Sequence, residues 1–362
     1  MAIFGRQLTF AGYARGFYLD AIAGRRTDFL SGAIRSVAYL LSAPYGSIVT
    51  IRNQLYERGV LKSRRLPVPV ISVGNITCGG TGKTPLVELV AKRLISLGKR
   101  PAIVSRGYSA REGRNDESVV LRQNLPSVPQ VLNPDRIAGG MRATTEYGAD
   151  CVILDDGFQH LKVERDVDIV VVDALNPFGY GFLIPRGLLR EPVKGLRRAD
   201  LIVLSHSNQV GKEKLARLCD FIAGICPGVP VLRAAHEAVA LVNRNGARLD
   251  CDWLKGRRVV GFCGIGNPDS FRITLQMSGA RLVGWKAFPD HYPYRTSDLK
   301  SIEELARETE AEAVVFTQKD AVKMPFHFGS DVPFLELRVR IVLPAPDAKV
   351  LNDVLLSSLQ HG

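Results

Sequence analysis

The stretch VISVGNITCGGTGKTP, residues 70–85, decides the fold of this 362-residue chain. It runs from apolar and small residues through a glycine-rich segment into lysine, threonine and proline. A buried strand that leads through such a loop into a helix is typical of phosphate binding, because backbone N–H groups and the helix N-terminus converge there on an anion. Pro85 suits the first helical turn, where an N–H would have no partner. The stretch therefore predicts an α/β domain that binds phosphate.

The residue types of this loop fit the phosphates of ATP together with Mg²⁺. Lys83 would neutralise phosphate charge, and the Thr84 hydroxyl would be a ligand of Mg²⁺. The first glycine of the usual pattern would fall at Thr77, so the match is incomplete, although Gly79 and Gly80 supply flexibility nearby. A glycine-rich turn without a ligand is the alternative that the Gly-Lys-Thr run disfavours. The predicted nucleotide contacts are Gly79, Gly80, Thr81, Gly82, Lys83 and Thr84.

Short apolar runs alternate with helical stretches beyond this loop. The first series consists of residues 68–73, 102–105, 151–154, 169–172 and 201–204. Strands that are apolar at nearly every position are buried on both faces, which predicts a mostly parallel sheet covered by helices. The second series consists of residues 258–263, 281–285 and 313–317. We predict a P-loop kinase domain over 67–235 and a smaller C-terminal α/β domain over 236–362, with a hairpin turn at 243–246.

The N-terminal segment, residues 1–66, is basic and amphipathic. The chain carries a formal net charge of +12, and its first 65 residues hold ten Lys and Arg against three Asp and Glu. Apolar residues recur at helical spacing over 29–41, and Pro44-Tyr45-Gly46 is expected to end this helix before a second one over about 47–58. Such a pair is typical of a helix at a membrane surface. Ordinary packing against a protein core produces the same pattern.

Composition restricts the class of protein. With 46% hydrophobic and 23% charged residues, the chain can form real cores, and its six cysteines contain no CxxC pair, which favours a reducing compartment. No cleavable signal pattern is present at the N-terminus. The basic charge favours a negative partner such as a nucleotide or an anionic bilayer. Neither a recognition helix nor an aromatic RNA-binding platform is apparent, so we expect no nucleic-acid partner and no obligate protein partner.

Acidic residues and a histidine follow predicted strands. Asp155 and Asp156 end an apolar run about 70 residues after the loop, where P-loop folds hold Mg²⁺; a polar turn is the alternative. The segment 185–192 brings Glu191 between turn-forming residues, where it could contact the metal or remain in solvent. Asp290 and His291 close a strand-like run. The predicted metal ligands are Thr84, Asp155, Asp156 and Glu191.

The order of these motifs resembles one family, the tetraacyldisaccharide 4'-kinases of lipid A biosynthesis. The motifs that carry the resemblance are Gly74-Asn75, residues 79–85, Ser105-Arg106-Gly107-Tyr108, residues 155–160, residues 190–192, Gly264-Ile265-Gly266-Asn267-Pro268, Asp290-His291 and residues 317–323. The resemblance implies Mg²⁺- and ATP-dependent transfer of the γ-phosphate to the 4'-hydroxyl of a tetraacyl glucosamine disaccharide 1-phosphate. It also implies a peripheral enzyme at an anionic surface, the cytoplasmic face of the inner membrane, where its acylated disaccharide substrate resides.

The resemblance further implies that Asp116 and His291 activate the acceptor hydroxyl while Lys83 binds phosphate. The family has Gly-Asp-Glu-Pro where this chain has Asn115-Asp116-Glu117-Ser118, so the choice between Asp116 and Glu117 stays open. We expect the nucleotide between the two domains, whose closure would bring His291 toward Asp116. The competing prediction is a membrane-associated regulatory P-loop NTPase, which would use hydrolysis as a switch.

Overall fold

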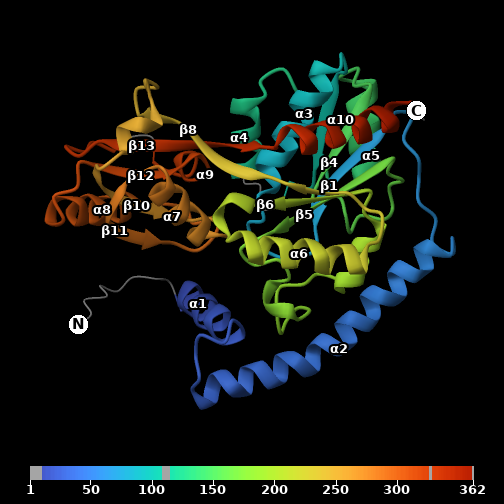
Figure 1. The fold of residues 1–362 in the computed structure, drawn as a ribbon, viewed down its shortest axis with the longest axis horizontal. Helices are drawn as coiled ribbons and strands as arrows, with labels where there is room; N and C mark the ends of the chain where they lie inside the picture. The colour runs from blue at the N-terminus through green and yellow to red at the C-terminus, as the bar shows by residue number, and fades with distance from the viewer. Residues whose placement is uncertain (1–9, 108–114, 326–327, 361–362) are drawn as a thin grey trace.

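The computed structural model describes residues 10–107, 115–325 and 328–360. Residues 1–9 of the predicted N-terminal segment and Tyr108, the last residue of the Ser105-Arg106-Gly107-Tyr108 motif, lie outside the described residues. Within these ranges the chain forms a helical pair followed by two sheets with their covering helices (Figure 1). We call the sheet of β1 to β7 with its helices the first unit, and the sheet of β8 to β13 with its helices the second unit.

The first unit contains an all-parallel sheet with the strand order β3-β2-β4-β1-β5-β6-β7. Its strands are β1 Val70–Asn75, β2 Pro101–Ser105, β3 Gln130–Leu132, β4 Cys151–Asp155, β5 Val167–Asp173, β6 Leu201–Ser205 and β7 Val231–Arg233. Its helices are α3 Lys83–Ser96, α4 Asp116–Asn124, α5 Arg136–Thr145 and α6 Lys212–Ile225, with 3₁₀ turns η1 Gly179–Gly181, η2 Val193–Arg198 and η3 Ser207–Gln209. The predicted mostly parallel α/β sheet is confirmed.

Both faces of this sheet are covered, which explains why its strands are apolar throughout. In β5, Ile169 and Val171 pack with α3 on one face, whereas Val170 and Val172 pack with α6 on the other. Every residue of β1, β4, β5 and β6 is buried. The carboxyl ends of β1 and β4 thus lie side by side on a rigid support.

The second unit has the strand order β11-β10-β12-β13-β8-β9, parallel from β11 to β13 and antiparallel from β13 to β9. Its strands are β8 Ala235–Asn243, β9 Arg248–Leu249, β10 Arg258–Cys263, β11 Arg281–Ala287, β12 Ala313–Thr317 and β13 Phe334–Val342. Its helical elements are η4 Cys251–Leu254, α7 Pro268–Met277, α8 Thr296–Glu308 and α9 Gln318–Ala321. The expected hairpin turn joins β8 to β9, where Asn243 N–H donates to the Ala247 carbonyl.

The chain passes between the units twice. A single residue, Ala234, separates β7 of the first sheet from β8 of the second. After β13 the chain returns, and α10 (Ala345–Leu359) places Leu351 and Leu355 in the same core as Ile71 and Val171 of the first sheet. The predicted domain limits remain predictions, but the last helix of the segment 236–362 packs on the first unit.

The N-terminal helices α1 (Phe10–Ile22) and α2 (Phe29–Glu57) extend below both sheets in Figure 1. We expected Pro44-Tyr45-Gly46 to separate a helix over 29–41 from another over about 47–58. This prediction is wrong, because α2 is a single helix that continues through Pro44. Contacts with the first unit hold both halves of the helix: Ser42 Oγ donates to the Leu183 carbonyl at 2.9 Å, and Tyr45 Oη donates to the Arg190 carbonyl at 2.6 Å. These contacts offset the backbone hydrogen bond that proline removes.

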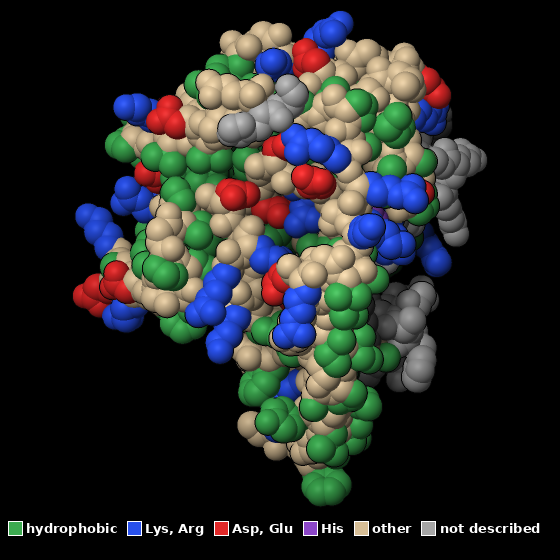
Figure 2. Space-filling model, turned by 90° about the vertical axis from the view of Figure 1, so that its right-hand side faces the viewer, with side chains coloured by type: hydrophobic (Ala, Val, Ile, Leu, Met, Phe, Trp, Pro, Cys, Tyr) green, Lys and Arg blue, Asp and Glu red, His purple; other side chains and the backbone are tan. Residues whose placement is uncertain are grey.

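One face of α2 is apolar and exposed. The opposite side of the helix is buried and includes Ala38 and Ser42. The exposed apolar side chains are Phe29, Leu30, Val37, Leu40, Leu41, Ile48 and Ile51, with Phe29 93% and Leu40 71% exposed. Figure 2 shows hydrophobic side chains gathered on the lower projection of the molecule, with Lys and Arg side chains above it. Among the helices of the described residues, none has the length and apolarity needed to cross a membrane.

Candidate functional site

The glycine-rich loop joins the buried end of β1 to the first turn of α3. Gly79 and Gly82 adopt φ of +111° and +84°, in which a side chain would be strained. The loop is held from two strands: Asn75 of β1 donates to Thr81 Oγ1 at 2.9 Å, and Ser205 of β6 donates to the Thr81 carbonyl at 2.7 Å. The sequence therefore builds an open, supported loop at a helix N-terminus, which fits a bound phosphate group.

A cavity of about 180 Å³ opens between this loop and the second unit. Residues 79–85 line one side. Apolar side chains that include Ile265, Phe271, Leu337 and Val339 line another. An apolar wall beside a phosphate-binding loop suits a flat base attached to a phosphate chain. The residues present therefore fit ATP, as the sequence predicted.

The two acids at the end of β4 lie in different environments. Asp156 accepts from Arg190 Nη1 at 2.9 Å and pairs with Lys83 Nζ at 3.4 Å. Burial alone would raise the pKa of Asp156, but Lys83 and Arg190 hold it at about 2. Burial raises the pKa of Asp155 to about 7, aided by the charges of Glu117 and Asp156. A dication near these oxygens would relieve that repulsion, and carboxylate and hydroxyl oxygens are what Mg²⁺ prefers.

The structure separates Glu191 from the other predicted metal ligands. Its side chain is fully buried, and its carboxylate accepts from Arg198 at 2.7 Å, Gln159 at 2.8 Å and Asn53 at 3.2 Å. Gln159 also accepts from Arg190, so Glu191 supports the arginine that contacts Asp156. In the described part of the chain no group of three or more His, Cys, Asp and Glu side chains is arranged to hold a metal alone. Phosphate and water oxygens would have to complete such a site.

Asp116 and His291, which lie 175 residues apart, form a direct pair. His291 Nδ1 lies 2.9 Å from Asp116 Oδ2 and 3.0 Å from Oδ1. The bond with Asp116 is the main cause that raises the pKa of His291. Although burial opposes it, the same bond and the charge of Lys319 lower the pKa of Asp116. The two groups thus favour an ionised carboxylate beside an imidazole, the arrangement of a base and its orienting partner.

The residues that depart from the family pattern around Asp116 have a structural role. The Asn115 side chain accepts from Ser118 N–H at 2.7 Å, and Ser118 Oγ accepts from Asn115 N–H at 3.2 Å. This reciprocal cap begins α4 at Asp116 and satisfies backbone donors of its first turn. Glu117 pairs instead with Lys319 at 3.1 Å. The carboxylate that meets His291 in this structure is therefore that of Asp116.

A second loop, Gly264–Pro268, lies against the glycine-rich loop. A Cβ atom on Gly266 would lie 2.2 Å from the Gly80 nitrogen, so only glycine allows this backbone contact. Asn267 Nδ2 donates to Asp173 Oδ2 of the first unit at 2.6 Å. This loop is one of the motifs that carry the family resemblance, and no role was predicted for it. In the structure it joins the second unit to the nucleotide loop.

A histidine pair that was not predicted from the sequence lies beside this contact. His206 Nδ1 lies 2.9 Å from Asp173 Oδ1, and the His206 ring contacts that of His236, with centroids 3.9 Å apart and planes tilted by 42°. Both rings line the cavity, and His236 Nε2 is buried without a hydrogen-bond partner in the structure. The position of His206 directly after a buried strand was the available signal. His236 gave no such signal, because it is the first residue of the predicted C-terminal domain and follows no predicted strand directly.

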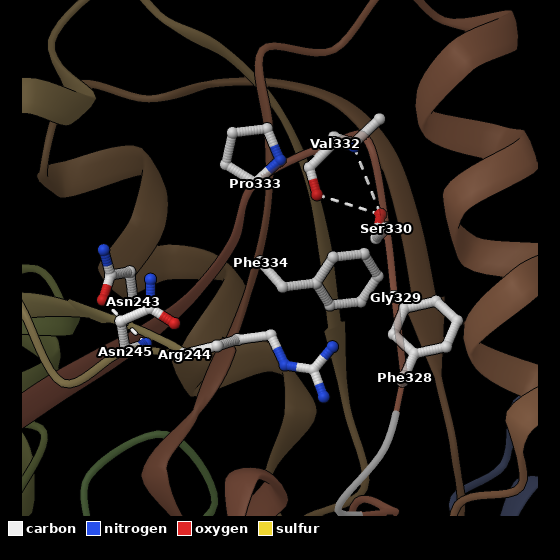
Figure 3. Close-up of a pocket in the computed structure, with 9 residues that line it drawn as sticks. All are labelled: Asn243, Arg244, Asn245, Phe328, Gly329, Ser330, Val332, Pro333 and Phe334. Atoms are coloured by element: carbon white, nitrogen blue, oxygen red, sulfur yellow. Dashed lines mark hydrogen bonds between the residues drawn. The ribbon is translucent and has the colours of Figure 1, made fainter.

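A wider hollow of about 720 Å³ lies at the tip of the β8–β9 hairpin (Figure 3). The Arg244 guanidinium lies 5.5 Å from the centroid of the Phe328 ring, and the remaining wall mixes polar residues such as Asn243 and Ser330 with apolar ones. None of the predicted site residues lines it. The predicted chemistry therefore belongs to the smaller cavity.

Comparison with known proteins identifies the family of the chain. The family model described as "Tetraacyldisaccharide-1-P 4'-kinase" matches residues 34–360. A tetraacyldisaccharide 4'-kinase of Syntrophus aciditrophicus is 42% identical over 321 residues, covering 81% of this chain and 86% of the relative. One of Pelobacter propionicus is 34% identical over 361 residues, covering 93% and 98%.

A solved structure is also similar over most of the chain. LpxK of Aquifex aeolicus, crystallised in its "apo" form in complex with ATP, is 30% identical with a TM-score of 0.70. The match covers 90% of this chain and 99% of that one. From the family model, the curated relatives and this structure together, we conclude that the chain belongs to the tetraacyldisaccharide-1-P 4'-kinase family.

Proposed function

We propose that this chain transfers the γ-phosphate of ATP to the 4'-hydroxyl of a tetraacyl glucosamine disaccharide 1-phosphate in lipid A biosynthesis. Family membership supports the reaction. The observation that carries it in this chain is the pairing of Asp116 with His291 beside the cavity that contains the glycine-rich loop. A phosphate-binding loop alone would serve many NTPases, whereas transfer to an alcohol also needs a group that accepts the hydroxyl proton.

In this proposal the first unit holds the triphosphate. The loop N–H groups and Lys83 would bind the phosphate oxygens, and the Asp156 carboxylate keeps the Lys83 ammonium group at the loop. Thr84, Asp155 and Asp156 would hold Mg²⁺, which would offset the negative charge of the phosphate oxygens. We leave Glu191 out of this set, because its carboxylate is fully buried among Arg198, Gln159 and Asn53, whereas the Asp156 side chain is partly exposed beside the loop.

Asp116 and His291 would orient the acceptor hydroxyl and take its proton. Asp116 is nearly buried, whereas the His291 side chain is 46% exposed and accessible to a large substrate. The paired carboxylate fixes the ring orientation and stabilises the protonated imidazole that forms when His291 accepts the proton. The apolar wall of the cavity would exclude water, so that ATP is not hydrolysed without transfer.

We also propose that α2 docks on an anionic membrane surface, which would place the enzyme peripherally on the cytoplasmic face of the inner membrane. The exposed apolar side chains of α2 have no protein partner in the described structure, and Lys and Arg are abundant in the same segment. An apolar face with adjacent basic side chains binds the boundary between head groups and acyl chains. An acceptor with four acyl chains would be reached there.

The test is phosphate transfer by the purified chain with ATP, Mg²⁺ and the tetraacyl disaccharide 1-phosphate in mixed micelles. We expect one ADP per phosphorylated lipid and little ADP without lipid. Lys83→Ala should lower turnover by about 100-fold or more, the scale of losing a preorganised phosphate contact. ATP hydrolysis at the same rate with and without acceptor would instead indicate a regulatory NTPase.

A further inference from the structure

Lys319 lies where the two units meet at the cavity. Its ammonium nitrogen is 3.1 Å from Glu117 Oε1, 3.5 Å from Asp290 Oδ1 and 3.8 Å from Asp116 Oδ2. Two of these carboxylates belong to α4 of the first unit, and the third belongs to the loop after β11 in the second unit. A single cation thus bridges both segments that supply the Asp116–His291 pair.

The three carboxylates around Lys319 are stable so close together only with a cation between them. Three carboxylates that converge within a few ångströms repel one another, and partial burial strengthens this repulsion. Although burial opposes it, Glu117, Asp290 and Asp116 raise the pKa of Lys319 above its ordinary value. The ammonium group therefore stays charged at the pH values where the enzyme would work. It acts as a fixed counter-ion and does not exchange protons with the substrate.

Neighbouring contacts fix the backbone that carries Lys319. The Thr317 side chain and the Asp320 carboxylate bond each other at 2.6 Å. The Gln318 amide exchanges hydrogen bonds with Asn124 at the end of α4, at 3.0 and 3.1 Å. Lys323, one turn later, bonds the buried Asp320 at 2.8 Å. Of these two lysines, Lys319 alone pairs with Glu117 and Asp290.

We propose that Lys319 is a positioning residue, which holds the Asp116 carboxylate against His291 by joining α4 to the Asp290–His291 loop. The inference rests on the proposed function, in which Asp116 and His291 act on the acceptor hydroxyl. It goes beyond that function, because Lys319 itself touches neither the acceptor nor its proton. Its effect on turnover passes through Asp116.

A double-mutant cycle tests this route. Lys319→Met should lower kcat by about 100-fold, the scale of a roughly 1 Å misplacement of a reacting group, with a smaller change in KM for ATP. In an Asp116→Asn background the same substitution should have little further effect, because the contact that it disturbs is already lost. A full further loss of kcat in that background would overturn the proposal and indicate that Lys319 contacts the phosphates directly.

A second measurement does not depend on activity. The pKa of His291, followed by NMR of its imidazole, should fall toward its ordinary value in Lys319→Met, because Asp116 would move away. Among the residues that the structure describes, Asp116, Asp290, Lys319 and Lys323 are the charged groups that act on this ring or on its partner carboxylate. Loss of the Lys319 charge without movement would raise the His291 pKa instead. An unchanged or raised value would therefore overturn the proposal even if the chain transferred no phosphate.

Matched variants separate positioning from stability. Lys319→Arg keeps the charge and should restore part of kcat and a raised His291 pKa. Lys286→Met removes a lysine of the second unit whose ammonium group donates to Ser301 Oγ at 2.6 Å and pairs with no carboxylate in the structure. It should leave both measurements unchanged. If both variants lost kcat equally, and in proportion to the fall in their thermal unfolding midpoints, the loss would reflect lower stability alone. That result would overturn the proposal.

Discussion

At the scale of single residues, Asp116 has two neighbours that act on it in the same direction. The His291 ring donates to it, and the Lys319 ammonium group lies 3.8 Å away. Both favour the ionised carboxylate although its side chain is almost fully buried. An acid that stays ionised inside a protein is available as a permanent partner for a base.

Replacement of this carboxylate should affect chemistry more than binding. We expect Asp116→Asn to lower kcat by about 10² to 10⁴-fold with a change in KM for ATP of less than about threefold, because the amide keeps the shape but loses the charge. Steady-state kinetics with the acceptor lipid gives both constants. Asp220→Asn, an exposed carboxylate on α6, is the matched control. An unchanged kcat would move the base elsewhere.

The pair should also make stability depend on pH. The pKa of His291 is raised above 6.5, so its contribution is complete below that value and is lost as pH rises through the folded-state pKa. The pKa of Asp116 is lowered below 3.8, so its contribution is lost only as pH falls through that lower value. We expect His291→Gln to reduce the free energy of unfolding more at about pH 5.5 than at about pH 9. Urea unfolding at both pH values measures this, and equal reductions would contradict it.

Residues of the glycine-rich loop and the acids after β4 could be predicted, because a strand, a loop and a helix that follow each other in sequence determine their positions. The pairing of Asp116 with His291 came only through a resemblance, since no local pattern joins residues 175 positions apart. Glu191 was predicted as a metal ligand from its place among turn-forming residues. The hydrogen bonds that its buried carboxylate accepts come from Asn53, Gln159 and Arg198, and no local pattern reveals them.

At the scale of elements, α2 shows how tertiary contacts override a local signal. Pro44 lies inside the helix because the side chains around it bond to the first unit. Gly46 assists the same approach, since a Cβ atom there would lie 2.6 Å from Leu183 Cδ1 and the leucine side chain would have to shift. The sequence predicted the amphipathic pattern correctly but not the continuity. As a result one side of the helix packs on protein while the other is left exposed.

The exposed side of α2 should control membrane binding. Ile48 is 67% exposed on the apolar face, whereas the exposed Thr50 lies on another side of the helix. We expect Ile48→Glu to weaken binding to anionic vesicles by about tenfold or more, because it loses apolar burial and adds like charge. Thr50→Glu adds the same charge and should weaken binding much less. Vesicle co-sedimentation measures the affinity of both variants. Equal losses of affinity would show that net charge alone, and not the apolar face, controls binding.

At the scale of the whole molecule, the two units meet through backbone as well as side chains. The Gly80–Gly266 contact and the Asn267–Asp173 hydrogen bond join the loop of the second unit to the nucleotide loop. Such contacts between units could not be predicted, because nothing in the sequence of either loop points to the other. The fold class could be predicted, since both sheets follow from the alternation of apolar runs and helices.

This contact should couple nucleotide binding to the approach of the units. Gly266→Ala would force the loops apart, so we expect it to remove most of the stabilisation by ATP and Mg²⁺, which is about 2.7 kcal/mol at 100 times Kd for an intact site. Thermal unfolding with and without nucleotide measures this. Gly224→Ala, in α6 with open space around it, should keep the full nucleotide effect. A full effect in Gly266→Ala would show that the contact is dispensable for binding.

The return of α10 to the first sheet has a practical consequence for dissecting the enzyme. Leu351 and Leu355 are completely buried there, and each such side chain contributes about 1.5–3 kcal/mol. A fragment cut before Ala235 would expose the surface that these leucines cover and should aggregate. Anyone wishing to express the nucleotide-binding half alone would have to splice the last helix back onto it, with a short linker in place of everything from β8 to β13.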